Sequence, residues 1–437
     1  MKRYLPALIG CFSVLALSGC SGLFASDDPP PLKGERISIM ELQKSLEPDD
    51  PVLEAQGLIM PEEWANEFWP QAGGYPNHSM QNLALPAKIT RAWTADIGDG
   101  ATDRLPLVAQ PIVVDDRIFT LNTHSRLSAF NIKNGDRLWH TDIADENEDD
   151  PVISGGIASG GNLLYVTNGF NEVLAVNPAS GEILWRQHIP APSRAAPTVI
   201  NNRVFVSTLD SRLLALSPND GRVLWEYTGL SDEAALLGAA SPAANNDIVL
   251  PVFSSGEITA LRIENGSIAW SDNLSNIRGQ GGLSTITDIR ALPVIDKGIV
   301  VAISFSGRLA AIDERTGTRI WQREISGSQT PWIAGNHIFV LSSDNQLIAL
   351  GRDTGSIRWV TKLPRFEDDE PIVLNGPVLA GGRLILAGSE GKIIEVSPEN
   401  GKVLGEWDAG GTISISPIVA GGTLYLLSKD GTLSAYR

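Results

Sequence analysis

A short pattern repeats along the chain and constrains the fold more than any other feature of the sequence. An alanine is followed six residues later by a glycine and four residues after that by a tryptophan. A seventh copy is degenerate, with Glu395, Gly401 and Gly405, and an eighth begins at Ala435. Successive copies start 38 to 51 residues apart, which is the period of a repeat architecture. The six complete copies are Ala129/Gly135/Trp139, Ala175/Gly181/Trp185, Ala215/Gly221/Trp225, Ala260/Gly266/Trp270, Ala311/Gly317/Trp321 and Ala349/Gly355/Trp359.

Each repeat is predicted to contain four short strands. In the first, residues 111–114, 117–121, 126–130 and 137–140 are rich in β-branched, aromatic and alternating residues, and turn-forming pairs separate them. The glycine supplies the positive φ of a tight turn, and the tryptophan ring can fill the wedge between neighbouring sheets. Tandem four-stranded units of this length predict an all-β protein with the fold of a β-propeller.

The last repeat ends before its glycine and tryptophan, so its fourth strand must come from another part of the chain. Residues 88–97 carry Trp93 and precede the first complete repeat. Pairing them with residues 432–437 would close the ring and remove an open sheet edge. We therefore predict an eight-bladed propeller over residues 88–437, with Trp93 in the closing strand.

The N-terminus is predicted to be a secretion signal with a site for lipid attachment. A basic start, an apolar stretch to Leu17 and small residues before Cys20 are typical of a signal peptide over residues 1–19. Leu17-Ser18-Gly19-Cys20 resembles the lipobox of bacterial lipoproteins, in which the cysteine is acylated, and Ser21 suggests sorting to the outer membrane. Cleavage would remove Cys11 and leave no partner for a disulfide. The expected location is the outer membrane, lipid-anchored and facing the periplasm.

Residues 20–87 are predicted to form a lipid-anchored tether. Asp27-Asp28-Pro29-Pro30-Pro31 is stiff and extended, because proline fixes φ and cannot donate a hydrogen bond. Trp64, Phe68 and Trp69 form an aromatic cluster, which we expect to pack on the main body. A peptide that binds a partner is the alternative interpretation of this cluster.

The composition argues against several classes of function. Acidic residues outnumber basic residues 51 to 34, and a net charge of −17 disfavours binding to nucleic acid. No apolar run reaches the ~18 residues of a membrane-spanning helix. The histidines contain no pair at metal-ligand spacing, so we predict no metal site. The acidic runs at 145–150 and 367–370 lack the alternating ligands of a calcium loop and are interpreted as exposed loop surface.

The repeats resemble those of quinoprotein dehydrogenases, most clearly at Ala311–Trp321. That resemblance implies an eight-bladed propeller, and in those enzymes the quinone cofactor and calcium bind at its centre beneath a disulfide between adjacent cysteines. The expected mature chain has no second cysteine for such a disulfide. We therefore predict no cofactor, no catalytic residues and no enzymatic activity.

A lipidated N-terminus followed by degenerate quinoprotein-type repeats is similar to the BamB family of outer-membrane assembly lipoproteins. The similarity is clearest over Asp288–Leu363, including Arg308-Leu309-Ala310-Ala311-Ile312-Asp313 and Asp344-Asn345-Gln346-Leu347-Ile348-Ala349-Leu350. It implies a non-catalytic scaffold of the β-barrel assembly (BAM) complex. Such a scaffold docks on the periplasmic POTRA domains of the barrel-inserting subunit, BamA, and unfolded outer-membrane proteins are a further expected partner.

Two inter-blade loops carry the docking contact in that family, and their counterparts here are partly changed. The resemblance assigns the contact to Leu236, Leu237, Gly238, Asp288 and Arg290. Leu237 stands where the family has arginine, and Arg290 stands where it has aspartate. The leucines could instead be buried between blades. A dehydrogenase-like protein, or an envelope lipoprotein that binds peptides or glycans, are the alternative functions.

Overall fold

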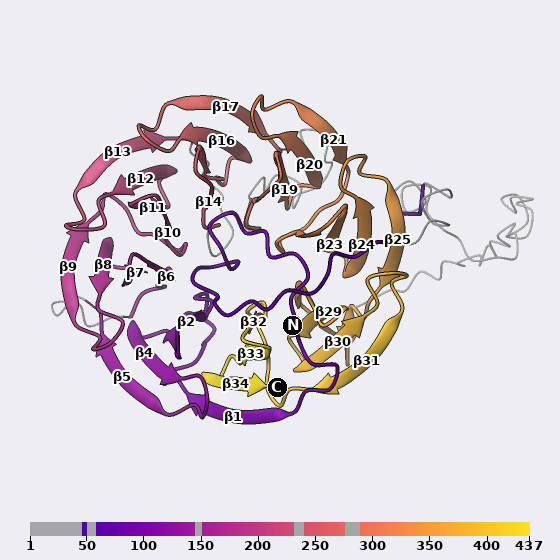
Figure 1. Ribbon diagram of the computed structural model, residues 1–437, viewed down its shortest axis with the longest axis horizontal. Helices are drawn as coiled ribbons and strands as arrows, with labels where there is room; N and C mark the ends of the chain where they lie inside the picture. Colours follow the sequence, from indigo (N-terminus) through magenta and orange to yellow (C-terminus); the bar gives the residue numbers. More distant parts are fainter. Residues whose placement is uncertain (1–45, 50–57, 145–150, 231–239, 276–288) are drawn as a thin grey trace, which may run out of the picture. The chain divides into compact units, whose positions relative to one another are not determined.

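Short runs of β-branched and aromatic residues form the antiparallel strands of this protein. The computed structural model describes residues 46–49, 58–144, 151–230, 240–275 and 289–437. Within these ranges the strands form eight four-stranded sheets, each with its strands in sequence order except the one closed by the N-terminal strand. Figure 1 shows the sheets arranged radially around a common centre, as in an eight-bladed propeller. The predicted fold class is confirmed.

The first four blades follow the chain from their innermost to their outermost strand. Blade 1 contains β2 (Ile112–Val114), β3 (Arg117–Leu121), β4 (Arg126–Asn131) and β5 (Arg137–Asp142). Blade 2 contains β6 (Ile157–Gly160), β7 (Leu163–Asn168), β8 (Glu172–Val176) and β9 (Ile183–His188). Blade 3 contains β10 (Thr198–Ile200), β11 (Arg203–Ser207), β12 (Arg212–Leu216) and β13 (Val223–Thr228). Blade 4 contains β14 (Ala243–Ala244), β15 (Ile248–Leu250), β16 (Glu257–Arg262) and β17 (Ile268–Asn273).

The last four blades repeat this arrangement, with one small hairpin between blades 6 and 7. Blade 5 contains β18 (Val294–Asp296), β19 (Ile299–Ser304), β20 (Arg308–Asp313) and β21 (Arg319–Arg323). Blade 6 contains β22 (Trp332–Ala334), β23 (His337–Leu341), β24 (Gln346–Gly351) and β25 (Ile357–Lys362). The hairpin is β26 (Phe366–Glu367) and β27 (Glu370–Pro371). Blade 7 contains β28 (Leu374–Ala380), β29 (Arg383–Gly388), β30 (Lys392–Val396) and β31 (Val403–Asp408). Blade 8 contains β32 (Ile418–Ala420), β33 (Thr423–Leu427), β34 (Thr432–Tyr436) and β1 (Arg91–Asp96).

The ring is closed by strands from opposite ends of the chain. β1 pairs antiparallel with β34, and Trp93 lies opposite Ala435 in the register. This is the closure predicted from the sequence. It leaves the last blade with the same alanine–tryptophan pair as the complete repeats, because the two halves of that repeat are supplied by the two ends of the propeller.

Each outer-strand tryptophan joins its blade to the next one. The Trp93 Nε1–H donates to the carbonyl of Ile132 at 2.9 Å, and the indole lies against Gly135. A Cβ at Gly135 would come within 2.6 Å of that ring, and the residue has φ +77°. Both the lack of space and the positive φ therefore require glycine at this position. The remaining indole donors reach the next blade in the same way at 2.6–3.3 Å: Trp139 to Pro178, Trp185 to Pro218, Trp225 to Ile263, Trp270 to Glu314, Trp321 to Arg352 and Trp359 to Pro398.

Blade 7 replaces this arrangement with another one. In its outer strand pair, Glu395 and Gly405 occupy the positions of the usual alanine and tryptophan. Trp407 lies two residues further along, on the same side of the strand, and its ring centre is 4.9 Å from that of Tyr436 in blade 8. Its Nε1–H donates to Glu395 within its own blade at 3.2 Å. The contact between blades 7 and 8 is therefore kept by a shifted tryptophan.

The segment from residue 58 to residue 87, which we call the inner belt, lies inside the ring of innermost strands. It is the indigo trace that circles the centre in Figure 1. Trp69 is 1% exposed, and Trp69 and Val113 of β2 exchange two backbone hydrogen bonds of 2.8 and 2.9 Å. The aromatic cluster that the sequence assigned to the tether thus packs on the propeller, and the compact unit starts at Leu46.

The inner belt bonds to the blades in their order around the ring. Starting at blade 8, it meets blades 1 to 7 in turn before the chain enters β1 and returns to blade 8. The contacts are Val419 with Asn66, Val113 with Trp69, Ser159 with Pro70, Val199 with Gln71, Ala244 with Pro76, Ile295 with Asn77, Trp332 with Gln81 and Leu379 with Leu83. These hydrogen bonds, 2.7–3.2 Å long, satisfy groups on the innermost strand of every blade.

Candidate functional site

The connections between blades lie at the same end of the sheets as the turns between second and third strands. We call this side the connection face. The first residue of a connection donates its N–H to a carbonyl in such a turn, as Ile143 does to Ser125 at 2.9 Å and Leu274 does to Gly256 at 2.8 Å. These hydrogen bonds hold the start of each of these connections against a turn of its own blade. They therefore fix the position from which the connection loop leaves the blade.

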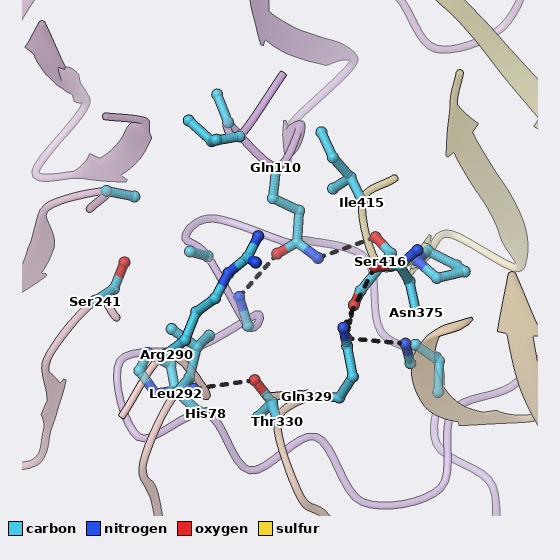
Figure 2. A pocket seen from close by; sticks show the side chains of 18 of the residues that line it. His78, Gln110, Ser241, Arg290, Leu292, Gln329, Thr330, Asn375, Ile415 and Ser416 are labelled. Atoms are coloured by element: carbon cyan, nitrogen blue, oxygen red, sulfur yellow. Dashed lines mark hydrogen bonds between the residues drawn. The ribbon is translucent and has the colours of Figure 1, made fainter. Parts of the chain in front are cut away.

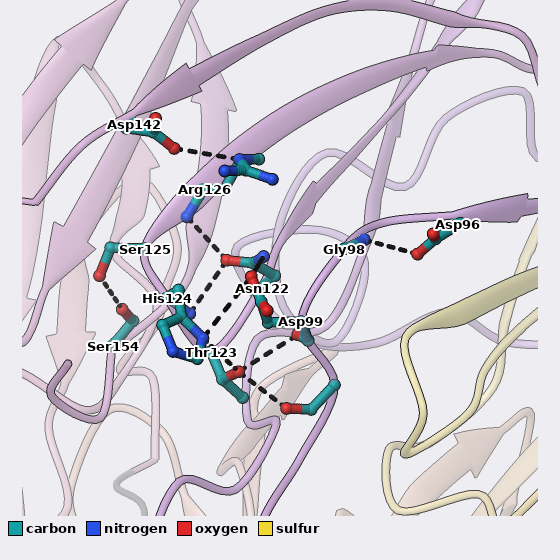
Figure 3. A network of polar contacts seen from close by, with 11 residues as sticks. Asp96, Gly98, Asp99, Asn122, Thr123, His124, Ser125, Arg126, Asp142 and Ser154 are labelled. Carbon is teal, nitrogen blue, oxygen red and sulfur yellow. Dashed lines mark hydrogen bonds and ion pairs between the residues drawn. The ribbon is translucent and has the colours of Figure 1, made fainter.

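Polar side chains hold the first connection in place (Figure 3). The Asn122 Oδ1 accepts from the backbone N–H groups of His124 and Arg126 at 3.0 and 2.8 Å, while its Nδ2 donates to Asp99 at 3.3 Å. The Thr123 hydroxyl donates to the carbonyl of Gly100 at 2.8 Å. Because these groups satisfy one another, we interpret this network as structural support.

Of the residues predicted to dock on a partner, the structure describes Arg290. Leu236, Leu237, Gly238 and Asp288 lie outside the described residues. Arg290 is described and is exposed, next to the buried Ile289. Leu230, at the start of the connection between blades 3 and 4, is 63% exposed, and its N–H donates to Glu257 at 2.7 Å. Cys20, the predicted lipidation site, also lies outside the described residues.

A cavity of about 180 Å³ occupies the centre of the ring; we call it the central cavity. Its floor comes from the inner belt, with Trp69, Gly73 and His78, and its walls come from the ends of the inter-blade connections. The belt itself bonds further along the innermost strands and to the turns beyond them, as at Gly381 and Gly421. The cavity therefore lies between the inner belt and the connection face.

One wall of the central cavity is a network of paired amides (Figure 2). The Gln110 Oε1 accepts from the Trp69 Nε1–H and the Gly73 N–H at 3.2 and 2.9 Å, and its Nε2 donates to the carbonyl of Ser416 at 3.2 Å. Gln329 donates to the Asn375 Oδ1 at 3.4 Å and accepts from the Ser416 hydroxyl at 3.4 Å. These side chains come from blades 1, 6, 7 and 8 and lock their inner ends together.

The charged side chains of the central cavity lie on the wall opposite these amides. Arg194, Ser241 and Arg290 come from the connections that enter blades 3, 4 and 5. Among the described residues that line the cavity there is no aspartate or glutamate. Both arginines stand three residues before the proline that precedes an innermost strand, Pro197 and Pro293. This shared position is the sequence signal that could have revealed Arg194, which the sequence analysis missed.

His78 lies in the floor of the central cavity and is 5% exposed. Burial lowers its pKa to about 4, against which the hydrogen bond to the carbonyl of Pro293 has a smaller opposing effect. The ring is neutral at pH 7, so Nδ1–H donates to that carbonyl at 2.7 Å and Nε2 is left as a buried acceptor without a partner. The backbone φ of +58° is unusual for this residue type.

Other candidate sites from the sequence are surface features. Glu367–Glu370 lie in the β26–β27 hairpin and are exposed, as predicted for that acidic run, while residues 145–150 lie outside the described ranges. Within those ranges no group of three or more histidine, cysteine or acidic side chains is placed to hold a metal ion. The described residues also contain no helix long and apolar enough to cross a membrane.

Comparison with known proteins agrees with this architecture. The family model for the outer membrane protein assembly factor BamB matches residues 123–361 and 367–437. BamB of Yersinia pestis is 25% identical over 368 residues, which are 83% of this chain and 91% of that protein. The inner belt lies outside the ranges that the family model matches.

Solved structures share the fold. The crystal structure of BamB from Moraxella catarrhalis superposes with a TM-score of 0.68 at 21% identity, covering 80% of this chain and all of that one. The quinohemoprotein alcohol dehydrogenase of Comamonas testosteroni superposes with a TM-score of 0.65 at 12% identity, covering 85% of this chain and 80% of that one. The family model alone spans well over half of the sequence, and the chain therefore belongs to the family of BamB outer membrane protein assembly factors.

Proposed function

We propose that this protein is a non-catalytic scaffold subunit of the complex that assembles β-barrel proteins in the outer membrane. The observation that carries the proposal is the match of the BamB family model to all strands of blades 2 to 5 and 7, nearly all of blade 6, three strands of blade 8 and two strands of blade 1. A propeller suits this role, because its connection face presents loops from many blades on one rigid frame.

The proposed partner is a BamA-like subunit, bound through its POTRA domains. The contact is assigned to the connections that enter blades 4 and 5, with Leu236, Leu237, Gly238, Asp288 and Arg290. The exposed Leu230 at the start of one connection and the exposed Arg290 at the end of the other support this assignment. An apolar contact with a charged rim is typical of a specific protein interface.

The absence of catalysis is proposed from the chemistry of the central cavity. A bound quinone with calcium, as the dehydrogenase resemblance would require, needs hard oxygen ligands for the cation, above all carboxylates. The part of the lining that the structure describes supplies two arginines and several amides but no aspartate or glutamate. This donor set does not fit calcium, and we derive no reaction step through such a group.

The docking assignment is tested by the double variant Leu236→Asp, Leu237→Asp. Affinity-tagged protein purified from the envelope should retain its fold but lose the BamA-like subunit, because two charges would be buried in an apolar contact. The matched control is Val403→Asp, Leu404→Asp on the exposed outer strand β31, which should keep the partner. Retention of the partner by the first variant would contradict the assignment.

A further inference from the structure

The charge of the central cavity is opposite to that of the protein as a whole. The chain carries a net charge of −17, yet the charged side chains among the described residues that line the cavity are Arg194 and Arg290. His78 in the floor is neutral at pH 7. A positively charged site with low-dielectric walls attracts and retains anions.

Two of the donors on this wall, Arg194 and Ser241, have no partner among the described residues. Arg194 makes no hydrogen bond or ion pair with any described residue, and Ser241, 3% exposed, has no partner for its hydroxyl among them either. The amides on the opposite wall bond to one another and to the inner belt, so they do not provide the missing acceptor (Figure 2). A guanidinium presents a planar fork of donors that matches a carboxylate.

The rest of the lining is apolar and the space is small. Leu107, Leu292, Trp332 and Ile415 line the cavity beside the polar groups. Its volume of about 180 Å³ is below the roughly 300 Å³ at which pockets for drug-sized ligands begin. The cavity therefore fits a small ligand that has one charged end.

We propose that the central cavity is a binding site for a small organic anion, a carboxylate on an apolar body about the size of one amino-acid side chain. The carboxylate would accept from Arg194 and Ser241, and the apolar body would lie against Leu107, Trp332 and Ile415. Arg290 lines the cavity and also belongs to the proposed docking contact, whereas Arg194 belongs to the cavity alone and can separate the two sites.

The test is calorimetric titration of the full mature protein with N-acetyl-L-leucine, its C-terminal amide and inorganic phosphate. The acid should bind at least about tenfold more tightly than the amide, since the amide loses charge-assisted hydrogen bonds. Inorganic phosphate should bind more weakly than the acid, because it has no apolar body. Equal affinity for acid and amide, or no binding of either, would overturn the proposal, and phosphate binding as tight as that of the acid would overturn the apolar subsite.

Variants separate this site from the docking surface. Arg194→Gln should weaken binding of the acid at least about tenfold while the BamA-like subunit still co-purifies. The control Arg137→Gln, on the exposed outer strand β5, should bind the acid like the wild type. Urea unfolding of both variants checks that the fold is intact. Unchanged binding in folded Arg194→Gln would contradict the site, whereas loss of the partner in Leu236→Asp, Leu237→Asp reports only on docking.

Discussion

Each blade-joining tryptophan depends on two small residues. Ala129 lies opposite Trp139 across the strand pair and leaves space for the indole to reach Phe119, whose ring centre is 5.8 Å away. Gly181 in the next blade accepts the other face of that indole. The sequence pattern was readable because three residues of one repeat have fixed partners at fixed distances along the chain.

His78 predicts a pH dependence of stability. In the folded protein its pKa is about 4, whereas the unfolded chain takes up the proton near 6.5. The contribution of the neutral ring to the free energy of unfolding is therefore fully present above pH 6.5. It declines as the pH falls toward 4, by about 2 kcal/mol at pH 5 for this residue. Between pH 7 and pH 5, the free energy of unfolding measured with denaturant should fall less for His78→Asn than for the wild type. Asparagine is chosen because it also tolerates the positive φ.

The comparison needs a histidine outside the core. The free energy of unfolding of His188→Asn, a variant on the exposed side of β9, should fall with pH as much as that of the wild type. An equal decline in His78→Asn and the wild type would show that His78 does not carry the effect. His337, whose pKa burial also lowers to about 4, is present in all three proteins and so cancels from the comparison.

The inner belt is the element that distinguishes this propeller from a ring of independent blades. Its hydrogen bonds reach groups on innermost strands that are far away in sequence, such as Asn66 with Val419 and Gln71 with Val199. Bonds of this kind tie the belt to global unfolding, because it cannot detach without exposing paired backbone groups at the ring centre.

Truncation of Trp69 tests whether the inner belt is part of the core. Trp69→Ala should lower the free energy of global unfolding by about 3–5 kcal/mol, the usual cost of removing a buried tryptophan. The control in the same segment is Ile59→Ala, where the side chain is 84% exposed and the change should stay within about 0.5 kcal/mol. A Trp69→Ala protein that unfolds at the wild-type denaturant concentration would mean that the belt is a detachable tether.

The sequence predicts the blades well and the belt poorly, for a physical reason. Trp93 and Ala435 could be paired because each belongs to a pattern seen six more times. The belt has no strand or helix period, and its partners are defined only once the ring has closed. The same holds for the central cavity, since Arg194 and Ser241 become neighbours through the radial arrangement of their blades and not through a local motif.

At the scale of the whole molecule, the proposed anchor and the propeller would have separate roles. The proposed anchor is the acylated Cys20, and buried acyl chains contribute about 0.8 kcal/mol per methylene. The propeller needs no lipid to fold, because its core and its closure are made by the chain itself. Attachment and folding should therefore respond to different substitutions.

Cys20→Ser tests the anchor. The variant should lose incorporation of labelled palmitate and leave the outer-membrane fraction, because the lipid would no longer hold it there. Cys11→Ser, within the expected signal peptide, is the matched control and should be labelled and retained like the wild type. Incorporation of palmitate into Cys20→Ser at the wild-type level would contradict the proposed anchor.

The path of the inner belt has a consequence for the order of assembly. It is made before any blade, yet its contacts include strands from every blade, the last of them near Val419. It can complete its hydrogen bonds only after the C-terminal strands have folded. The part of the propeller that is synthesised first is therefore the last to form all of its native contacts. A chain that lost its final repeat would lack the Val419 carbonyl to which Asn66 donates. The inner belt could therefore complete its hydrogen bonds only in a chain whose ring is complete.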